Sequence, residues 1–372
     1  MTKNDDKCVP ALRFKGFNND WAQRMLGEIS IVNSGKDYKQ LNKGNIPVYG
    51  TGGYMLSVDQ YLSKNDAVGI GRKGTIDHPQ YLKAPFWTVD TLFFMTVREN
   101  NNLHYLYSLF QKINWKKYDE STGLPSLSKK TINNISVKVP EYIEQKRIGN
   151  FISQVDSLLS LQQRKLQQLK LLKKAMLQDL FTDKNVPKLR FNGFDANWIQ
   201  CKLEKEALLT MGQSPSGSTY SDQPSTYILV QGNADLKNGW VKPRIWTTQI
   251  TKLAKKGDII ITVRAPAGKV GRTNFDVVLG RGVASIQGND FIFYLLSKMD
   301  MNKYWKKYAA GSTFESINSN DIKNTRVHVP NLPEQNRIAN LFLRLDDLIR
   351  FQQNKLNNLQ KTKQFLFQNM FI

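Results

Sequence analysis

Cysteine and histidine are both scarce in this chain of 372 residues. The two cysteines, Cys8 and Cys201, lie far apart and lack the spacing of a disulfide framework or a zinc site. The three histidines, His78, His104 and His328, are also widely separated and show no ligand-like spacing. We therefore expect no metal site in this chain, and the cysteine content indicates a reducing compartment, the cytoplasm.

Motifs that carry catalysis are missing as well. The chain has no G-x-x-x-x-G-K-[ST] phosphate loop, which argues against an ATP-driven motor. No two prolines are adjacent, so the Asn/Asp-Pro-Pro-aromatic loop with which amino-methyltransferases hold a target adenine is absent. The tripeptide EQK at 144–146 has the carboxylate–lysine order of some nuclease sites, but its copy at 334–336 reads EQN. We assign both to the start of a helix and expect a protein that binds and has no catalytic residues.

Apolar runs long enough to cross a bilayer are absent, and the N-terminus MTKNDDKCVP lacks the apolar segment of a secretory signal. Acidic residues are few: 31, against 53 lysines and arginines, which gives a net charge of +22 and a pI near 9.8. Such a field attracts polyanions, and nucleic acid is the leading partner because each neutralised phosphate releases counterions. The alternative is a basic surface that only keeps the protein soluble.

The chain contains an internal repeat in two registers. The opening motif recurs 177 positions later, through the pairs Pro10/Pro187, Leu12/Leu189, Arg13/Arg190, Phe14/Phe191, Gly16/Gly193, Phe17/Phe194 and Trp21/Trp198. Later strings recur at an offset of 190: WKKY (115–118 and 305–308), ISVKVP with TRVHVP (135–140 and 325–330), and EQKRIGNF with EQNRIANL (144–151 and 334–341). The offsets differ by 13 residues, so the second copy carries a net insertion of that size. Each half is a fixed frame around a variable interior.

The frame predicts a strand followed by a long helix. In ISVKVP, apolar residues alternate with polar ones, as in a half-buried strand, and Pro140 then blocks further pairing. Glu141 and Glu144 stand where a helix N-terminus favours negative charge. Each following helix of about forty residues would be roughly 60 Å long. In the repeated WKKY we expect a packed tryptophan and solvated lysines.

Both predicted helices carry a heptad seam. The seam residues are Ile148, Ile152, Val155, Leu159, Gln162, Leu166 and Leu169 in the first helix, and Ile338, Phe342, Leu345, Ile349, Gln352, Leu356 and Leu359 in the second. A seam this narrow requires a partner helix, so we predict an intramolecular coiled coil; the alternative is that each helix packs only on its own globular part. The matched glutamines set the register of the pair but do not decide its direction.

The variable interiors offer candidate DNA-binding residues at turns. Arg72 and Lys73 lie in DAVGIGRKGTI (66–76), and a strand-like run in GDIIITVRAPAGKVGR (257–272) leads into Arg264. Arginine can bind guanine O6 and N7 through two hydrogen bonds, and lysine supplies a point charge. The predicted set is Lys36, Arg72, Lys73, Arg264, Lys269, Arg272 and Arg281. The alternative is that these are solvated turn residues or phosphate contacts without sequence information.

These residues resemble those of the specificity subunits of type I restriction–modification systems. The resemblance covers essentially the whole chain and is carried by the P-x-L-R-F-x-G-F…W openings, the P-x-x-x-E-Q-x-R-I strings and the turns GRKGTI and VRAPAGKVGR. It implies that each interior is a target-recognition domain reading one part of a bipartite, asymmetric site in double-stranded DNA. It also implies that the helices pack antiparallel and dock two methyltransferase subunits, that two restriction and translocation subunits can join, and that S-adenosylmethionine, ATP and magnesium belong to those partners.

The predicted fold is therefore α+β: two mixed α/β target-recognition domains, related by a pseudo-two-fold repeat and joined by two long antiparallel helices. The predicted segments are a first target-recognition domain (1–140), a first helix (141–183), a second target-recognition domain (184–330) and a second helix (331–372). The rival functions are a stand-alone DNA-binding regulator with a coiled-coil spacer, a self-contained DNA modification enzyme, and a structural coiled-coil scaffold unrelated to DNA.

Overall fold

The computed structural model describes residues 9–309 and 316–372, so Cys8 lies outside the described residues. The chain folds as two compact units. The first unit ends at Arg164 and also contains Gln353–Ile372, whereas the second is Lys165–Gln352. Each unit thus joins a globular part to the start of one long helix and the end of the other, a grouping in space that differs from the four segments along the sequence.

The first unit is α+β. Its short helical elements are α1 (Leu26–Ile29), α2 (Leu103–Lys112), the 3-10 turn η1 (Trp115–Tyr118) and α3 (Lys129–Asn133). Its sheets, in spatial order, are β1 (Ala22–Met25) with β9 (Ser136–Val139); β2 (Ser30–Ser34), β8 (Leu92–Val97), β5 (Ala67–Gly71) and β6 (Gln80–Leu82); and β4 (Gly53–Val58), β3 (Lys43–Gly50) and β7 (Trp87–Thr88). Strand β5 is central and buried along its whole length, and it places Arg72 and Lys73 at its carboxyl end.

The second unit repeats this plan with additions. Its short helical elements are η2 (Leu203–Lys205), η3 (Gly217–Thr219), η4 (Asn233–Asp235), α5 (Asp290–Met301), α6 (Lys306–Ala309) and α7 (Ser319–Lys323). Its sheets, in spatial order, are β10 (Ile199–Lys202) with β22 (Arg326–Val329); β11 (Leu208–Met211), β21 (Val283–Gln287), β18 (Ile259–Thr262), β19 (Val270–Arg272), β15 (Trp240–Val241) and β14 (Leu236–Lys237); and β12 (Tyr220–Ser221), β16 (Ile245–Thr247), β13 (Tyr227–Val230), β20 (Val277–Leu279) and β17 (Leu253–Ala254). The order β11-β21-β18-β19 matches β2-β8-β5-β6, and β14 and β15 extend that sheet.

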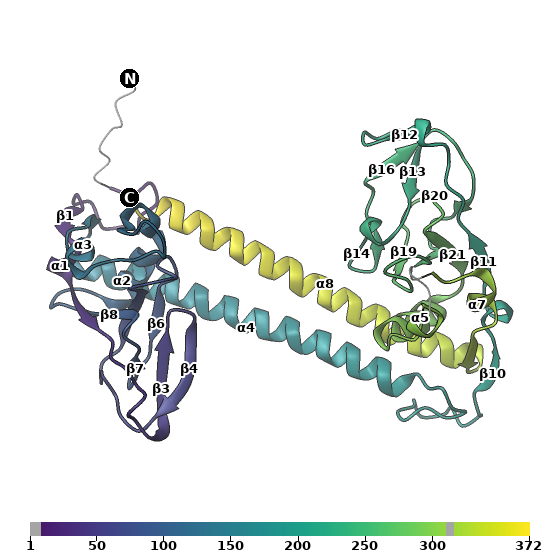
Figure 1. Cartoon of the computed structure of the whole chain (residues 1–372), viewed down its shortest axis with the longest axis horizontal. Helices are drawn as coiled ribbons and strands as arrows, with labels where there is room; N and C mark the ends of the chain where they lie inside the picture. The colour runs from purple at the N-terminus through teal and green to yellow at the C-terminus, as the bar shows by residue number, and fades with distance from the viewer. Residues whose placement is uncertain (1–8, 310–315) are drawn as a thin grey trace. The chain divides into compact units, whose positions relative to one another are not determined.

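The two long helices are α4 (Tyr142–Leu180) and α8 (Leu332–Asn369), drawn in teal and yellow in Figure 1. In the first unit Lys363 Nζ of α8 lies 2.6 Å from Asp156 Oδ1 of α4, and in the second unit Lys173 Nζ of α4 lies 2.5 Å from Asp346 Oδ1 of α8. From Asp156 to Lys173 along α4, the partners on α8 run backwards, from Lys363 to Asp346. The helices are antiparallel, and the predicted coiled coil is confirmed.

The residues of the heptad seam are withdrawn from solvent. Those that are buried are Ile148, Ile152, Gln162, Leu166, Ile338, Phe342, Leu345, Gln352 and Leu356, and those that are half-buried are Val155, Leu159, Leu169, Ile349 and Leu359. A narrow apolar stripe on each helix is the pattern that packs against a single partner helix. Among the described residues, no helix is both long and apolar enough to span a membrane.

Each unit also buries the end of the helix that begins in the other unit. Leu366, Met370 and Phe371, at the end of α8, belong to the core of the first unit, where Phe371 stacks on Tyr105 with ring centroids 5.7 Å apart. The end of α4 supplies Leu177, Leu180 and Phe181 to the core of the second unit in the same way. The repeated tryptophans Trp115 and Trp305 are buried and their lysines exposed, as predicted.

Candidate nucleic-acid interface

In each half, the opening motif contacts the EQ string through an arginine–glutamate pair, which we call the joint: Arg13 with Glu144 and Arg190 with Glu334. In the first unit, Arg13 Nε and Nη2 donate to the two carboxylate oxygens of Glu144 at 2.7 and 2.8 Å. Glu144 is 1% exposed, and its hydrogen bond with Arg13 raises the pKa of that guanidinium above its ordinary value. In the second unit, Arg190 Nε and Nη2 donate to Glu334 at 2.8 and 2.7 Å. A planar guanidinium is the group that makes such a fork.

The same joint holds the end of the other long helix. Leu12 N donates to Asn369 O at the end of α8, and Leu189 N donates to Asp179 O at the end of α4, at 2.8 and 2.9 Å. The opening motif therefore ties the start of one helix to the end of the other. Glu144 lies in the first turn of α4, as predicted from the helix dipole, and the structure adds a second role, because the Glu144 carboxylate is buried against Arg13.

The glutamine of the EQ string fixes the globular part to the helix. In the first unit, Asn102 N donates to Gln145 Oε1 at 3.0 Å, and the Asn102 side chain caps α2. In the second unit, Asn289 Nδ2 donates to Gln335 Oε1 at 2.7 Å, and Asn289 caps α5. This role was missed from the sequence, although the repeat of glutamine at the same offset marked it as part of the frame.

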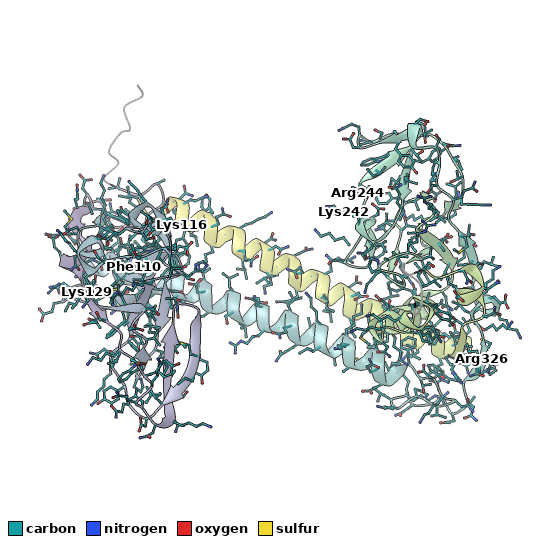
Figure 2. The ribbon with its side chains drawn as sticks, in the orientation of Figure 1. Phe110, Lys116, Lys129, Lys242, Arg244 and Arg326 are labelled. Carbon is teal, nitrogen blue, oxygen red and sulfur yellow. The ribbon has the colours of Figure 1, made fainter. Side chains whose placement is uncertain are left out.

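In the first unit, two of the predicted DNA-binding residues share a cavity. Arg72 and Lys73 line a space of about 390 Å³ together with Lys129, which Figure 2 labels on the first unit. The Arg72 guanidinium lies over the Phe93 ring at 5.7 Å. Lys36 is exposed but does not line this cavity, because it leaves the sheet beside β7, where its carbonyl accepts from Trp87 Nε1.

In the second unit, the predicted residues separate into two pairs. Arg264 and Arg281 come together in a cavity of about 190 Å³. Lys269 is engaged with Asp300 at 2.9 Å, and Arg272, 13% exposed, is ion-paired with Asp290 of α5. The Arg272 guanidinium also lies 4.3 Å from the centroid of the Phe293 ring. Arg264 and Arg281 are exposed, and within the described part of the chain neither side chain has a hydrogen bond or ion pair.

Lys73 and Arg264 occupy the same place in the two units. Lys73 forms an isolated antiparallel bridge with Ser126, and Arg264 forms one with Ser316. The serines are 190 residues apart and belong to the frame, whereas the two cations belong to interiors that do not align. The frame therefore holds a cation at the carboxyl end of the central strand in both units.

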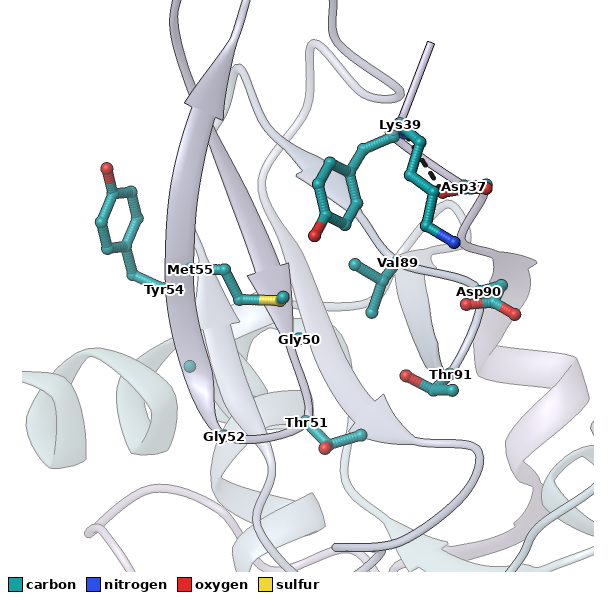
Figure 3. A pocket seen from close by; sticks show the side chains of 12 residues that line it. Asp37, Lys39, Gly50, Thr51, Gly52, Tyr54, Met55, Val89, Asp90 and Thr91 are labelled. Carbon is teal, nitrogen blue, oxygen red and sulfur yellow. Dashed lines mark hydrogen bonds between the residues drawn. The ribbon is translucent and has the colours of Figure 1, made fainter. Parts of the chain in front are cut away.

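A further cavity of the first unit lies between the β3–β4 hairpin and the turn after β7 (Figure 3). Its volume is about 570 Å³, and its charged lining residues are Asp37, Lys39 and Asp90. Neither carboxylate is among the residues predicted from the sequence, since those are all cations at turns. No local string marks them, since the cavity is assembled from segments up to 54 residues apart along the chain.

Two of the histidines, the carboxylate of Asp77 and Cys201 have contacts with neighbouring side chains that account for their positions. His78 and Lys116 both contact the Asp77 carboxylate, and the hydrogen bond from Lys116, with a smaller one from His78, lowers the pKa of Asp77 to about 2. His104 stacks on Tyr81 at 5.0 Å. Burial, with a smaller contribution from Glu206, raises the pKa of the Cys201 thiol to about 11. Residues 9–309 and 316–372 contain no group of three or more side chains placed to hold a metal ion.

This chain is similar to known proteins over most of its length. A family model described as "Type I restriction modification DNA specificity domain" matches residues 18–171 and 210–361. The chain is 29% identical over 290 residues to the putative type I restriction enzyme MjaX specificity subunit of Methanocaldococcus jannaschii, which covers 72% of this chain and 68% of that protein. It is 24% identical over 287 residues to the MjaVIII specificity subunit of the same organism, covering 71% and 68%.

Solved structures share the fold. The S subunit of a type I restriction–modification system from M. genitalium superposes with a TM-score of 0.72 at 12% identity, over 98% of this chain and 99% of that one. A chain from a study of complex assembly and conformational transition of the type I R-M system superposes with a TM-score of 0.55 at 19% identity, over 93% and 96%. At such identities the likeness concerns the backbone alone.

Proposed function

This chain belongs to the family of type I restriction–modification specificity subunits, and we propose that its two units read the two parts of a bipartite, asymmetric DNA site. The proposal rests on one observation: the two units share the same framework of contacts but have cavities that differ from each other. The joint of Arg13 with Glu144 recurs as that of Arg190 with Glu334, but the cavities next to the two sheets differ in size and charge. One frame with two different reading surfaces suits a target whose halves differ.

We propose that residues 1–140 and 184–330 are the two target-recognition domains, and that 141–183 and 331–372 form the spacer between them. Both long helices contribute to the core of both units, so a change in helix length is expected to change the distance between the reading surfaces. The spacer of the DNA site would then follow the length of the coiled coil.

The chain is a non-catalytic specificity subunit, so the chemistry lies with its partners. We propose that two methyltransferase subunits bind S-adenosylmethionine, and that two restriction and translocation subunits use ATP and magnesium. Exposed apolar side chains on the long helices supply a docking surface for the methyltransferases. These are Leu158 and Leu161 on α4, 38% and 55% exposed, and Leu348 and Phe351 on α8, 52% and 66% exposed.

These two apolar pairs are related by the offset of 190 residues, one pair to each unit. Because α4 and α8 are antiparallel, two identical partners docked on them would be oriented in opposite directions. Such partners could methylate an adenine on each DNA strand. An apolar side chain more than half exposed on a helix is favoured at an interface rather than in water.

The docking proposal is tested by co-purification. Changing Leu161→Glu or Phe351→Glu alone should remove one methyltransferase subunit from the complex, and the double variant should remove both. Gln163→Glu, an exposed change beside Leu161, is the control and should leave the stoichiometry unchanged. Retention of both partners by the double variant, measured by native mass spectrometry, would reject this surface.

We propose that Lys36, Arg72, Lys73, Arg264, Lys269 and Arg281 contact DNA, since all six are exposed cations; Lys269 would exchange its ion pair with Asp300 for a phosphate. Arg272 is mostly buried and already has Asp290 and Phe293 as partners, so we assign it to holding β19 on α5 rather than to a base. The excess of positive charge supports a large phosphate contribution to binding. We propose the cytoplasm as the place where the complex meets its DNA.

The test of the proposed function is a methylation map. Cells that express the chain together with its partner methyltransferase should carry methylated adenines in one bipartite motif, which single-molecule sequencing reads directly. A stand-alone regulator would instead bind a specific site without the partner and leave no methylated motif. A palindromic motif would contradict the proposal that the two units read different sequences.

A further inference from the structure

A tight turn in the first unit joins β7 to β8 and forms one wall of the 570 Å³ cavity. Leu92 N donates to Val89 O at 3.0 Å and closes the turn, while Val89 N donates to Tyr49 O of β3 at 3.0 Å. On the other side, Thr91 O accepts the N–H of Arg72, the first residue after β5, at 2.8 Å. The turn is thus held from both neighbouring sheets.

The second unit repeats these hydrogen bonds one for one between β20 and β21. Val283 N donates to Gly280 O at 3.2 Å, and Gly280 N donates to Val230 O of β13 at 2.7 Å. Gly282 O accepts the N–H of Val263, the first residue after β18, at 2.9 Å. The strands after the two turns, β8 and β21, are both second in their sheets, and the strands before them, β7 and β20, each pair in parallel with one neighbour, β3 and β13.

A glycine marks the same point beneath both turns. A side chain on Gly35 would place Cβ 1.9 Å from Val89 O, and one on Gly212 would place it 2.1 Å from Gly280 O. Both glycines are therefore required by the same close approach of the backbone. The correspondence of hydrogen bonds and glycines makes Asp90, at the tip of the first turn, the structural equivalent of Arg281.

The two cavities beside these turns share four corresponding positions, and the second also extends to Arg264, whose equivalent Lys73 lines a different cavity of the first unit. The first is lined by Asp37 and Asp90 with the hairpin residues Gly50 and Thr51 (Figure 3). The second is lined by Ser214, Gln231, Gly232 and Arg281, which occupy the corresponding positions. Asp37 follows Gly35 by two residues, as Ser214 follows Gly212.

The charges at the corresponding positions of the two cavities are opposite. The first unit presents the carboxylates of Asp37 and Asp90, and the second presents Ser214 and the guanidinium of Arg281 without an acidic residue. A phosphate site would need positive charge in both copies, because carboxylates repel phosphate and raise the cost of its approach. A base-reading site has no such requirement, because base edges carry donors in some cases and acceptors in others.

We propose that this cavity reads a base in each unit, and that Asp90 and Arg281 are the equivalent residues that set which base is accepted. The second unit reads guanine, whose O6 and N7 accept two hydrogen bonds from a guanidinium. The first unit reads a base that presents an amino group in the major groove, adenine or cytosine, whose N–H groups donate to the carboxylate of Asp90. This inference rests on the proposed function and names the ligand class of each unit.

Methylation mapping of variants in the assembled complex tests the inference. Arg281→Ala should reduce the preference for guanine at one position of one half-site by roughly 10-fold or more, and Asp90→Ala should do the same for adenine or cytosine at one position of the other. Arg281→Lys keeps the charge but loses the planar fork, so it should also relax the preference. The charge-matched controls are Arg326→Ala and Glu99→Ala, exposed residues that do not line these cavities.

The outcomes separate the inference from the function on which it rests. A wild-type chain that yields no bipartite motif contradicts the proposed function itself. A wild-type bipartite motif overturns the inference alone if Arg281→Ala lowers methylation evenly at all sites, if Arg281→Lys restores it fully, or if both alanine variants act in the same half. Because Asp90 and Arg281 are both exposed turn residues, circular dichroism should show wild-type folding for the alanine variants.

Discussion

Single residues show that the cations of this chain serve two purposes. Arg13 and Arg190, each 14% exposed, form forks with the buried carboxylates of Glu144 and Glu334, and they hold helix ends in place instead of contacting DNA. Arg264 is exposed at the end of a central strand and without a side-chain partner in the described part of the chain. Net charge therefore favours a polyanionic partner, whereas burial and pairing decide which individual cations are available to bind it.

The fork of the first unit, in which the Glu144 carboxylate is buried, should be costly to break. Glu144→Ala leaves the Arg13 guanidinium without its carboxylate, and we expect a loss of about 3 kcal/mol of unfolding free energy. Glu99→Ala, which removes an exposed carboxylate in the same unit, is the control and should have almost no effect. Hydrogen exchange at the start of α4 and the end of α8 would measure the change, and equal protection in both variants would argue against the joint.

Arg264 should contribute to sequence preference if it contacts a base. Replacing it by alanine is expected to relax the preference at one position of one half-site, by roughly 1–3 kcal/mol. Lys73→Ala, at the equivalent position of the first unit, should act in the other half-site. Binding measured against salt concentration distinguishes the alternative, since a phosphate contact would weaken all sequences alike and make the salt dependence shallower.

The two long helices carry the same charged residues 190 positions apart, and these residues form ion pairs because the helices are antiparallel. Asp156 and Lys173 of α4 correspond to Asp346 and Lys363 of α8, so the same two charges on each helix meet their opposites when one helix is reversed. Partly buried ion pairs add specificity of register more than net stability. The buried glutamines Gln162 and Gln352 are a second polar feature at matched seam positions.

Lengthening both helices equally should change the spacer of the DNA site. Seven residues inserted between Arg164 and Lys165, with seven more between Asn354 and Lys355, keep the heptad seam and fall midway between the two ion pairs. One heptad adds about 10 Å, equivalent to about 3 base pairs. Methylation mapping would detect the longer spacer, and an insertion into one helix only should instead break assembly. Full activity with an unchanged spacer would contradict the ruler role.

At the scale of the whole molecule, duplication lets two reading surfaces vary inside a constant frame. The family match falls once on each half, at 18–171 and 210–361, and the joint of opening motif and helix start is present in both units. The second unit has additional strands and a smaller, positively charged cavity. The units are therefore equivalent in construction and unlike in what they present.

Exchanging one interior should change one half-site. Residues 30–97 carry β2 to β8 of the first unit and leave β1, which pairs with β9 of the frame, in place. Replacing them with the corresponding interior of another specificity subunit should alter one half of the methylated motif and leave the other half and the spacer as they were. A map in which both halves move would refute this modular behaviour.

The sequence alone determined the duplicated frame, the two long helices and their seam, and the absence of catalytic motifs. These follow from local strings and from the periodicity of apolar residues, which act over short stretches of chain and survive in both copies. Tertiary structure alone decided that Arg13 pairs with Glu144, that Lys269 and Arg272 are already engaged, and that Asp90 corresponds to Arg281. These facts depend on backbone hydrogen bonds between distant segments, and a backbone hydrogen bond leaves no trace in residue identity when the side chains around it have diverged.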